Sequence, residues 1–217
     1  MLSKYAYSHD SINSYIDLEN NDDINTILME SITNTHIFDK TLLINGTQLV
    51  IPSTNVQNLY DTIHNNDNSQ VKSYSFLLKL LYDLSIQLKY FIETHKKCYI
   101  GLSPKDVMII NNSSCFCINK DLLFDIHKNN IVINNPFEKN GGFFAPEILD
   151  IKNIPATVDY KCSYYSLGLI IIYIMNPSEE KCNIDILKKS YLINTDLYYM
   201  IRRCLQPDIS RRSIIYI

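Results

Sequence analysis

The chain has 217 residues, of which 46% are hydrophobic and 20% are charged, and its formal net charge is −3. This length and composition suit one large domain or two small lobes with a sizeable core, and they exclude a disordered chain. The slight negative charge also argues against nucleic acid or an anionic membrane surface as a partner.

The six cysteines include no CxxC pair and have no His cluster beside them, which argues against a zinc site. The residues before Asp10 show no apolar run behind a basic start, so no secretory signal is expected. The longest apolar run, Leu167 to Met175, is far shorter than the roughly 20 residues of a membrane-spanning helix. We therefore expect reduced core thiols, no membrane span and a cytoplasmic location.

The first part of the chain predicts few regular elements. The segment from Asp10 to Asp23 is polar and shows no clear period. Apolar residues at helical spacing then predict a helix over about 22–33. Strand-like runs on either side of Asn45-Gly46 predict a hairpin over 41–51, because this dipeptide favours tight hairpin turns. The polar stretch from His64 to Gln70 predicts a loop.

The second part of the chain shows mostly helical patterns. Leu and Phe recur on one face of a long amphipathic helix predicted over 74–95. Two short strands with a turn between them are predicted over 107–118. Residues 121–144 show no regular pattern. Three further helices are predicted over 158–175, 183–190 and 195–205.

Four short motifs resemble those of protein kinases. Residues 101–109 (GLSPKDVMI) resemble the catalytic loop and the strand after it. Ala145-Pro146-Glu147 matches the APE motif that closes the activation segment. Residues 163–168 (SYYSLG) resemble the SDVWSLG segment, and residues 204–212 (CLQPDISRR) resemble the CLxxDPxxR segment near the end of the domain. The motifs stand in the family's order at near-family spacing, and this order carries the resemblance.

The resemblance implies a protein-kinase-like α+β fold. Residues 1–70 would form a reduced N-terminal β-lobe with a helix, a β-hairpin and a hinge, and residues 71–217 a mostly helical C-terminal lobe. Glu147 and Arg212 match an ion pair that ties the activation segment to the later helices in this family. We expect this pair as a structural contact.

The resemblance also implies that the catalytic positions are degenerate. Gly101 stands at the position of the catalytic Asp and has no side chain that could accept a proton. Asp106 replaces the metal-binding Asn, and Asn119 replaces the metal-binding Asp of the DFG motif, which makes a poorer ligand for a hard cation. Lys120 replaces the Phe of that motif, so its charged tip must reach water or the packing is lost. A short shift of the alignment would instead place Asp121 at the position of the metal ligand.

The sequence also lacks the residues that hold the nucleotide in protein kinases. No glycine precedes Gly46, so no glycine-rich loop can bring backbone amides to phosphates. Lys4 is the only lysine before Lys40, and no apolar strand precedes it. We therefore expect no cofactor and no bound metal.

Three functions follow as hypotheses. The first is a pseudokinase that serves as a protein-binding or regulatory module without phosphoryl transfer, with a kinase or a kinase substrate as its protein partner. The second is an atypical active Ser/Thr protein kinase that uses Asp106 and Asp121. The third is an unrelated helical interaction protein in which the order of the motifs is a coincidence. The Asn- and Ile-rich composition would suit a large DNA virus or a compacted parasite genome, and a viral source would imply a location in the host cytoplasm.

Overall fold

The computed structural model describes residues 5–20, 22–38, 40–65, 72–139, 142–177 and 184–214. The first part of the chain forms, in order, β1 (Tyr7–His9), β2 (Asn13–Asp17), α1 (Asp23–Asn34), β3 (Leu42–Ile44), β4 (Gln48–Pro52), β5 (Val56–Asn58) and α2 (Leu59–Asn65). The chain continues with α3 (Tyr74–Tyr90), the π-helical turn η1 (Phe91–His95), β6 (Lys97–Tyr99), β7 (Gly101–Leu102), β8 (Val107–Ile110), β9 (Ser114–Cys117), β10 (Leu123–His127) and β11 (Asn130–Ile133). The last elements are β12 (Phe143–Phe144), α4 (Pro146–Leu149), β13 (Ala156–Asp159), α5 (Cys162–Met175), α6 (Asp185–Lys188), α7 (Asp196–Cys204) and the 3-10 turn η2 (Ile209–Arg211).

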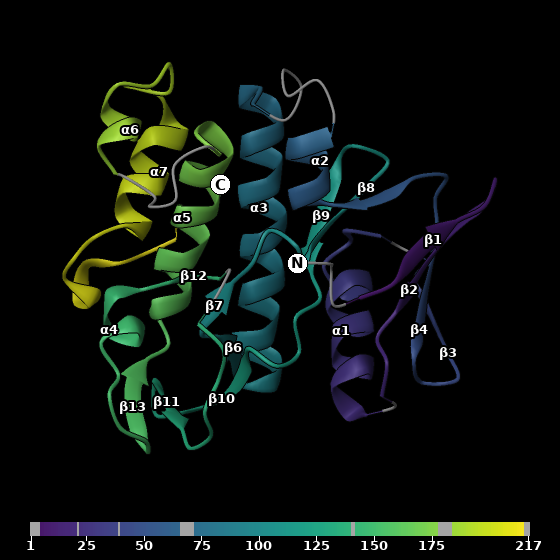
Figure 1. Cartoon of the computed structure of the whole chain (residues 1–217), viewed down its shortest axis with the longest axis horizontal. Coiled ribbons are helices and arrows are strands. Elements are labelled where there is room, and N and C mark those ends of the chain that lie inside the picture. The colour runs from purple at the N-terminus through teal and green to yellow at the C-terminus, as the bar shows by residue number, and fades with distance from the viewer. Residues whose placement is uncertain are drawn as a thin grey trace.

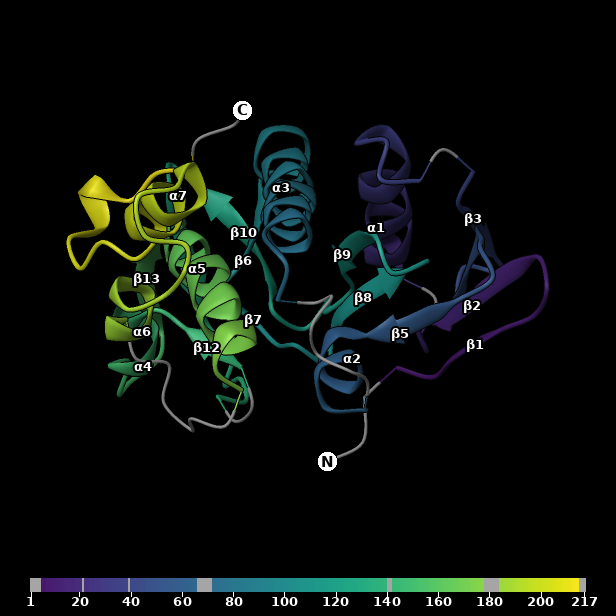
Figure 2. The same cartoon turned by 90° about the horizontal axis from the view of Figure 1, so that it is seen from above.

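Helix α3 stands at the centre of the molecule. Figure 1 shows α5, α6 and α7 on one side of it, and α1 with the sheet of β1 to β4 on the other. The view from above gives the same order across the molecule (Figure 2). The strands form four small antiparallel sheets, in the orders β1-β2-β4-β3, β5-β8-β9, β13-β11-β10-β6 and β12-β7.

Helix α3 and the π-helical turn η1 together cover the predicted range 74–95, and α3 has the buried face that its sequence predicts. The Ser73 side chain caps its first turn by accepting a hydrogen bond from the backbone N–H of Phe76. Its apolar face is buried against β9, α5 and α1. The helix ends in η1, and Lys96 then adopts a left-handed conformation (φ 52°) that turns the chain into β6.

Two predicted hairpins are confirmed, and Asn residues form their turns. Asn45 (φ 51°) and Gly46 (φ 72°) are both left-handed between β3 and β4. Asn111 (φ 49°) and Asn112 (φ 54°) are left-handed between β8 and β9. Asn tolerates this conformation better than most residues, and the resulting turns match the twist of the paired strands.

Helix α5 is buried along most of its length, as its apolar sequence predicts. Gly168 lets α7 approach it closely. A Cβ at this position would lie 2.7 Å from Cγ of Leu205, which follows α7. None of the helices in the described ranges is long and apolar enough to cross a membrane.

The predicted division into a reduced β-lobe and a mostly helical, protein-kinase-like lobe is wrong. The described part of the chain is mixed α+β, with 38% helix and 24% strand, and it does not show these lobes. Strands β6 to β13 all lie after residue 71, in the part expected to be mostly helical. These strands have two to five residues each, which is too short for an alternating pattern to stand out from the surrounding sequence. The predicted boundary between residues 70 and 71 lies outside the described residues and stays a prediction.

Candidate functional site

Two of the predicted site residues lie in direct contact. Asn119 donates from Nδ2 to Oδ2 of Asp106 over 2.5 Å. Asp106 is buried in the turn before β8, where its backbone N–H donates to Ser103 and its carbonyl accepts from Ile118. The side-chain Oδ1 of Asn119 in turn accepts a hydrogen bond from the backbone N–H of Leu122. Both polar ends of the Asn119 amide are therefore used to hold the segment that leads from β9 into β10.

Gly101 is buried beneath an aromatic ring. It lies in β7 and pairs with Phe144 of β12. A Cβ built on Gly101 would lie only 2.2 Å from Cε1 of Phe144, and Phe144 itself is buried. At this position, where the resemblance places a catalytic Asp, any side chain would require the ring to move.

Lys120 is buried inside the molecule with its charge fully paired. Its ammonium group donates to Oδ2 of Asp22 (2.8 Å), to the carbonyl of Asn20 (3.2 Å) and to Oδ1 of Asn25 (3.3 Å). The three acceptors match the three donors of a lysine. Asp22 is also the N-cap of α1, where its other oxygen accepts from the backbone N–H of Asn25. The expectation that this side chain must reach water or lose its packing is therefore wrong.

Tyr5 is packed against the segment that contains Lys120. Its hydroxyl accepts a hydrogen bond from the backbone N–H of Lys120, and only 1% of the residue is exposed. Burial, together with the nearby negative charge of Asp106, raises the pKa of Tyr5 above its ordinary value of 10. The phenol therefore stays neutral and acts as a packing group with one polar tip.

Two buried polar side chains of α3 form hydrogen bonds with the backbone of β9. The sequence patterns did not single out either of them. Gln87 accepts from the backbone N–H of Cys117 (2.8 Å) and donates to its carbonyl (3.0 Å) and to the Ser31 hydroxyl of α1 (3.0 Å). One turn earlier, Asp83 accepts from the backbone N–H of Cys115 (3.0 Å). Burial raises the pKa of Asp83, whereas its bond to Lys79 opposes this shift. Positions i and i+4 of one helix thus satisfy the backbone of an edge strand.

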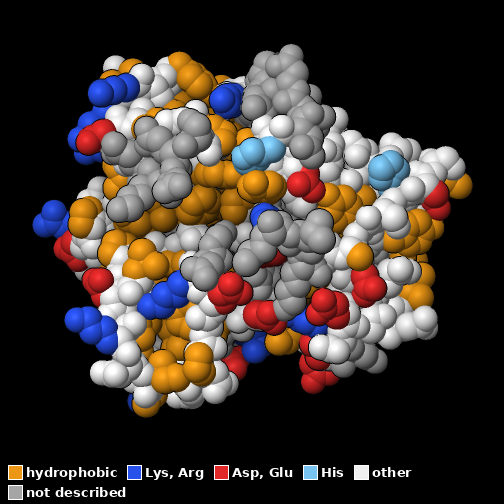
Figure 3. All heavy atoms as spheres, viewed as in Figure 1, with side chains coloured by type: hydrophobic (Ala, Val, Ile, Leu, Met, Phe, Trp, Pro, Cys, Tyr) orange, Lys and Arg blue, Asp and Glu red, His pale blue; other side chains and the backbone are white. Residues whose placement is uncertain are grey.

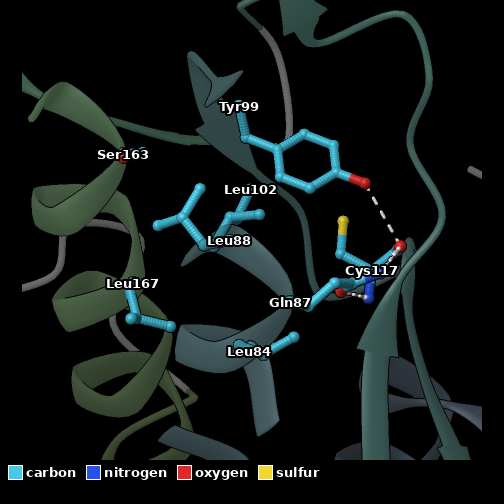
Figure 4. A pocket seen from close by; sticks show the side chains of 8 residues that line it. All are labelled: Leu84, Gln87, Leu88, Tyr99, Leu102, Cys117, Ser163 and Leu167. Carbon is cyan, nitrogen blue, oxygen red and sulfur yellow. Dashed lines mark hydrogen bonds between the residues drawn. The ribbon is translucent and has the colours of Figure 1, made fainter. Parts of the chain in front are cut away.

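A small, mostly apolar cavity lies between α3, α5 and the strands. The side chains around it are labelled in Figure 4, namely Leu84, Gln87, Leu88, Tyr99, Leu102, Cys117, Ser163 and Leu167. Its volume of about 10 Å³ is near the lower limit for a single water molecule. The Tyr99 hydroxyl donates to the carbonyl of Cys117 over 3.2 Å. This volume is too small for a substrate. Burial raises the pKa of the Cys117 thiol to about 12, so this thiol does not form a reactive thiolate.

Glu147 and Arg212 form the ion pair that the motifs imply. Nη1 and Nη2 of Arg212 donate to the two carboxylate oxygens of Glu147, at 2.5 and 2.9 Å. The arginine side chain is fully buried, its Nε donates to the carbonyl of Gln206, and its guanidinium lies over the ring of Tyr165. The pair joins α4 to the segment after α7, and we expect it to stabilise the fold.

The described ranges contain no group of three or more His, Cys, Asp or Glu side chains that could hold a metal ion. Asp121 is exposed, whereas Asp106 is buried against Asn119. The two carboxylates named for an active enzyme therefore lie in different environments.

No model of a protein family matches this chain, and no curated protein shows significant similarity to it. The resemblance to protein kinases therefore rests on the four motifs of the chain itself.

Proposed function

We propose that the protein is a pseudokinase in the functional sense, a protein-binding or regulatory module that performs no phosphoryl transfer. The observation that carries this proposal is the ring of Phe144 over Gly101. Phosphoryl transfer needs a group that accepts the proton of the attacking hydroxyl, and this buried glycine supplies none.

The neighbouring residues support the same proposal because structural contacts occupy them. The Asn119 amide is held by Asp106 and Leu122, and the Lys120 ammonium is held by Asp22, so neither group is turned toward a ligand. A metal or a phosphate would have to displace these buried bonds. Leaving a buried polar group without its partner costs about 1–3 kcal/mol, and more for a charge.

The active-kinase alternative has less support. Asp106 is buried, and one of its two carboxylate oxygens already accepts the hydrogen bond from Asn119. The second alternative is an unrelated helical interaction protein; the lack of kinase-like lobes is compatible with the unrelated origin, but the 24% strand content does not fit a helical protein. This alternative predicts the same absence of catalysis.

Nucleotide binding tests the proposal. Thermal unfolding of the full chain would be followed with and without millimolar ATP and magnesium. We expect no magnesium-dependent stabilisation, whereas a ligand present at 100 times its dissociation constant would stabilise the fold by about 2.7 kcal/mol. A clear shift that requires magnesium, and that Asp106→Asn or Asp121→Asn removes, would contradict the proposal. Magnesium alone and ATP alone serve as controls.

A further inference from the structure

Basic side chains gather on α6 and α7, two helices that both pack against α5. Lys188 is the last residue of α6, Lys189 follows it, and Arg202 and Arg203 lie in the last turn of α7. All four residues are exposed. Figure 3 shows Lys or Arg side chains over α6, at the upper left of the view. These helices lie on the opposite side of α3 from the sheet of β1 to β4 (Figures 1 and 2).

The four basic groups share one nearby carboxylate. Nζ of Lys188 pairs with Oδ1 of Asp185 over 2.6 Å. This bond raises the pKa of Lys188, whereas the positive charge of Arg202 opposes the shift, so the two cations lie close enough to interact. The bond from Lys188, with a smaller contribution from the charge of Lys189, lowers the pKa of Asp185. Among the described residues, Arg202 and Arg203 have no carboxylate partner, so this surface keeps an excess of positive charge.

A buried tyrosine holds an aromatic ring beside these charges. The guanidinium of Arg202 lies over the ring of Tyr198, 5.6 Å from its centroid, and the ring of Tyr199 meets the same ring edge-on at 5.3 Å. Tyr199 is 49% exposed, and Arg203 follows it by one helical turn on the same face of α7. Arg and Tyr are enriched where proteins bind one another, and an arginine already held over a ring loses less freedom when it binds.

We propose that the exposed face of α7 around Arg202 and Arg203 binds an acidic segment of another protein, whose Asp or Glu side chains flank an apolar residue. The planar guanidinium groups match carboxylates in two-point hydrogen bonds, and the apolar residue would pack on Tyr199. The chain as a whole carries a net charge of −3, so its long-range field disfavours nucleic acid, whereas a short acidic segment meets only the local positive charge. This inference rests on the proposed function and names the chemistry of the partner.

Two short labelled peptides test it, one in which Glu residues flank a central Leu and one with Gln in place of every Glu. Binding of each to the full chain would be followed by fluorescence anisotropy at low and high salt. We expect the Glu peptide to bind, more weakly at high salt, and the Gln peptide not to bind. The double variant Arg202→Gln/Arg203→Gln should bind the Glu peptide at least about tenfold more weakly, because it removes two charge-assisted contacts. Tyr199→Ser should weaken binding but keep its dependence on salt, because it removes an apolar contact and no charge.

The matched control is the double variant Lys40→Gln/Lys128→Gln, which removes the same two charges at exposed positions before β3 and between β10 and β11. It should bind the Glu peptide as the parent does. Equal binding of both peptides, or an equal loss in the control and in the α7 double variant, would overturn the inference. So would tighter binding of a single-stranded oligonucleotide, or self-association in sedimentation experiments that the α7 double variant abolishes, since the occupant would then be a nucleic acid or a second copy.

Failure of the Glu peptide to bind would also overturn this inference. It would leave the proposed function standing, because that function is decided by ATP, magnesium and phosphoryl transfer.

Discussion

The ring of Phe144 covers Gly101 so closely that a Cβ at residue 101 would lie 2.2 Å from its Cε1. The two residues pair across β7 and β12, in a part of the chain that is packed against α5. The lack of a side chain at residue 101 is therefore a packing requirement of this fold.

Gly101→Ala is expected to destabilise the protein by about 1–3 kcal/mol, because the added methyl group overpacks the core against Phe144. Urea unfolding of the purified variant measures this cost. The companion Phe144→Leu removes the ring, so the double variant should cost less than the sum of the two single changes. Strict additivity would show that the two positions are not in contact. Gly101→Asp should likewise destabilise the protein and create no kinase.

The contact between Lys120 and Asp22 leads to a second prediction. Asp22→Ala removes the N-cap of α1 and one of the three acceptors of a buried ammonium group. We expect it to cost more than the roughly 1 kcal/mol of a typical lost N-cap, because the lysine charge loses its only carboxylate contact in the described ranges. Asp23→Ala, at the exposed neighbouring position, is the matched control and should cost less than half as much. Equal losses in chemical unfolding would show that the lysine contact is unimportant.

Some of these features were predictable from the sequence and others were not. Helices α3 and α5 were predictable because local apolar periodicity determines them. The two Asn turns were predictable because the backbone preferences of Asn and Gly determine them. Lys120 was recognised as an unusual residue, but its partner Asp22 lies 98 residues earlier in the chain, and no local pattern connects them. The short strands, and the position of Phe144 over Gly101, likewise depend on long-range packing. The Glu147–Arg212 pair was predictable only through the motifs.

Gln87 leads to a third prediction. Gln87→Met keeps a similar volume but leaves the backbone N–H of Cys117 without its side-chain partner, whereas the Cys117 carbonyl keeps its bond from the Tyr99 hydroxyl. We expect a loss of about 1–3 kcal/mol, the cost of one unsatisfied buried group. The loss should be accompanied by faster amide hydrogen exchange at Cys117. Lys89→Met, at a partly exposed position of the same helix, should change the stability by no more than about 0.5 kcal/mol and leave the exchange at Cys117 unchanged. Unchanged exchange at Cys117 would contradict the assigned bond.

Phosphoryl transfer tests the central claim most directly. The full chain would be incubated with labelled ATP and with magnesium or manganese, in the presence and absence of generic protein substrates, beside Asp106→Asn and Asp121→Asn purified in the same way. We predict no transfer above background to the chain itself or to any substrate, because no base stands at Gly101 and Asn119 and Lys120 are held in buried contacts. Weak transfer that is equal in all three proteins would indicate a contaminating kinase. Transfer by the parent that either variant abolishes would contradict the account, since it would show one of these carboxylates at work on metal or substrate.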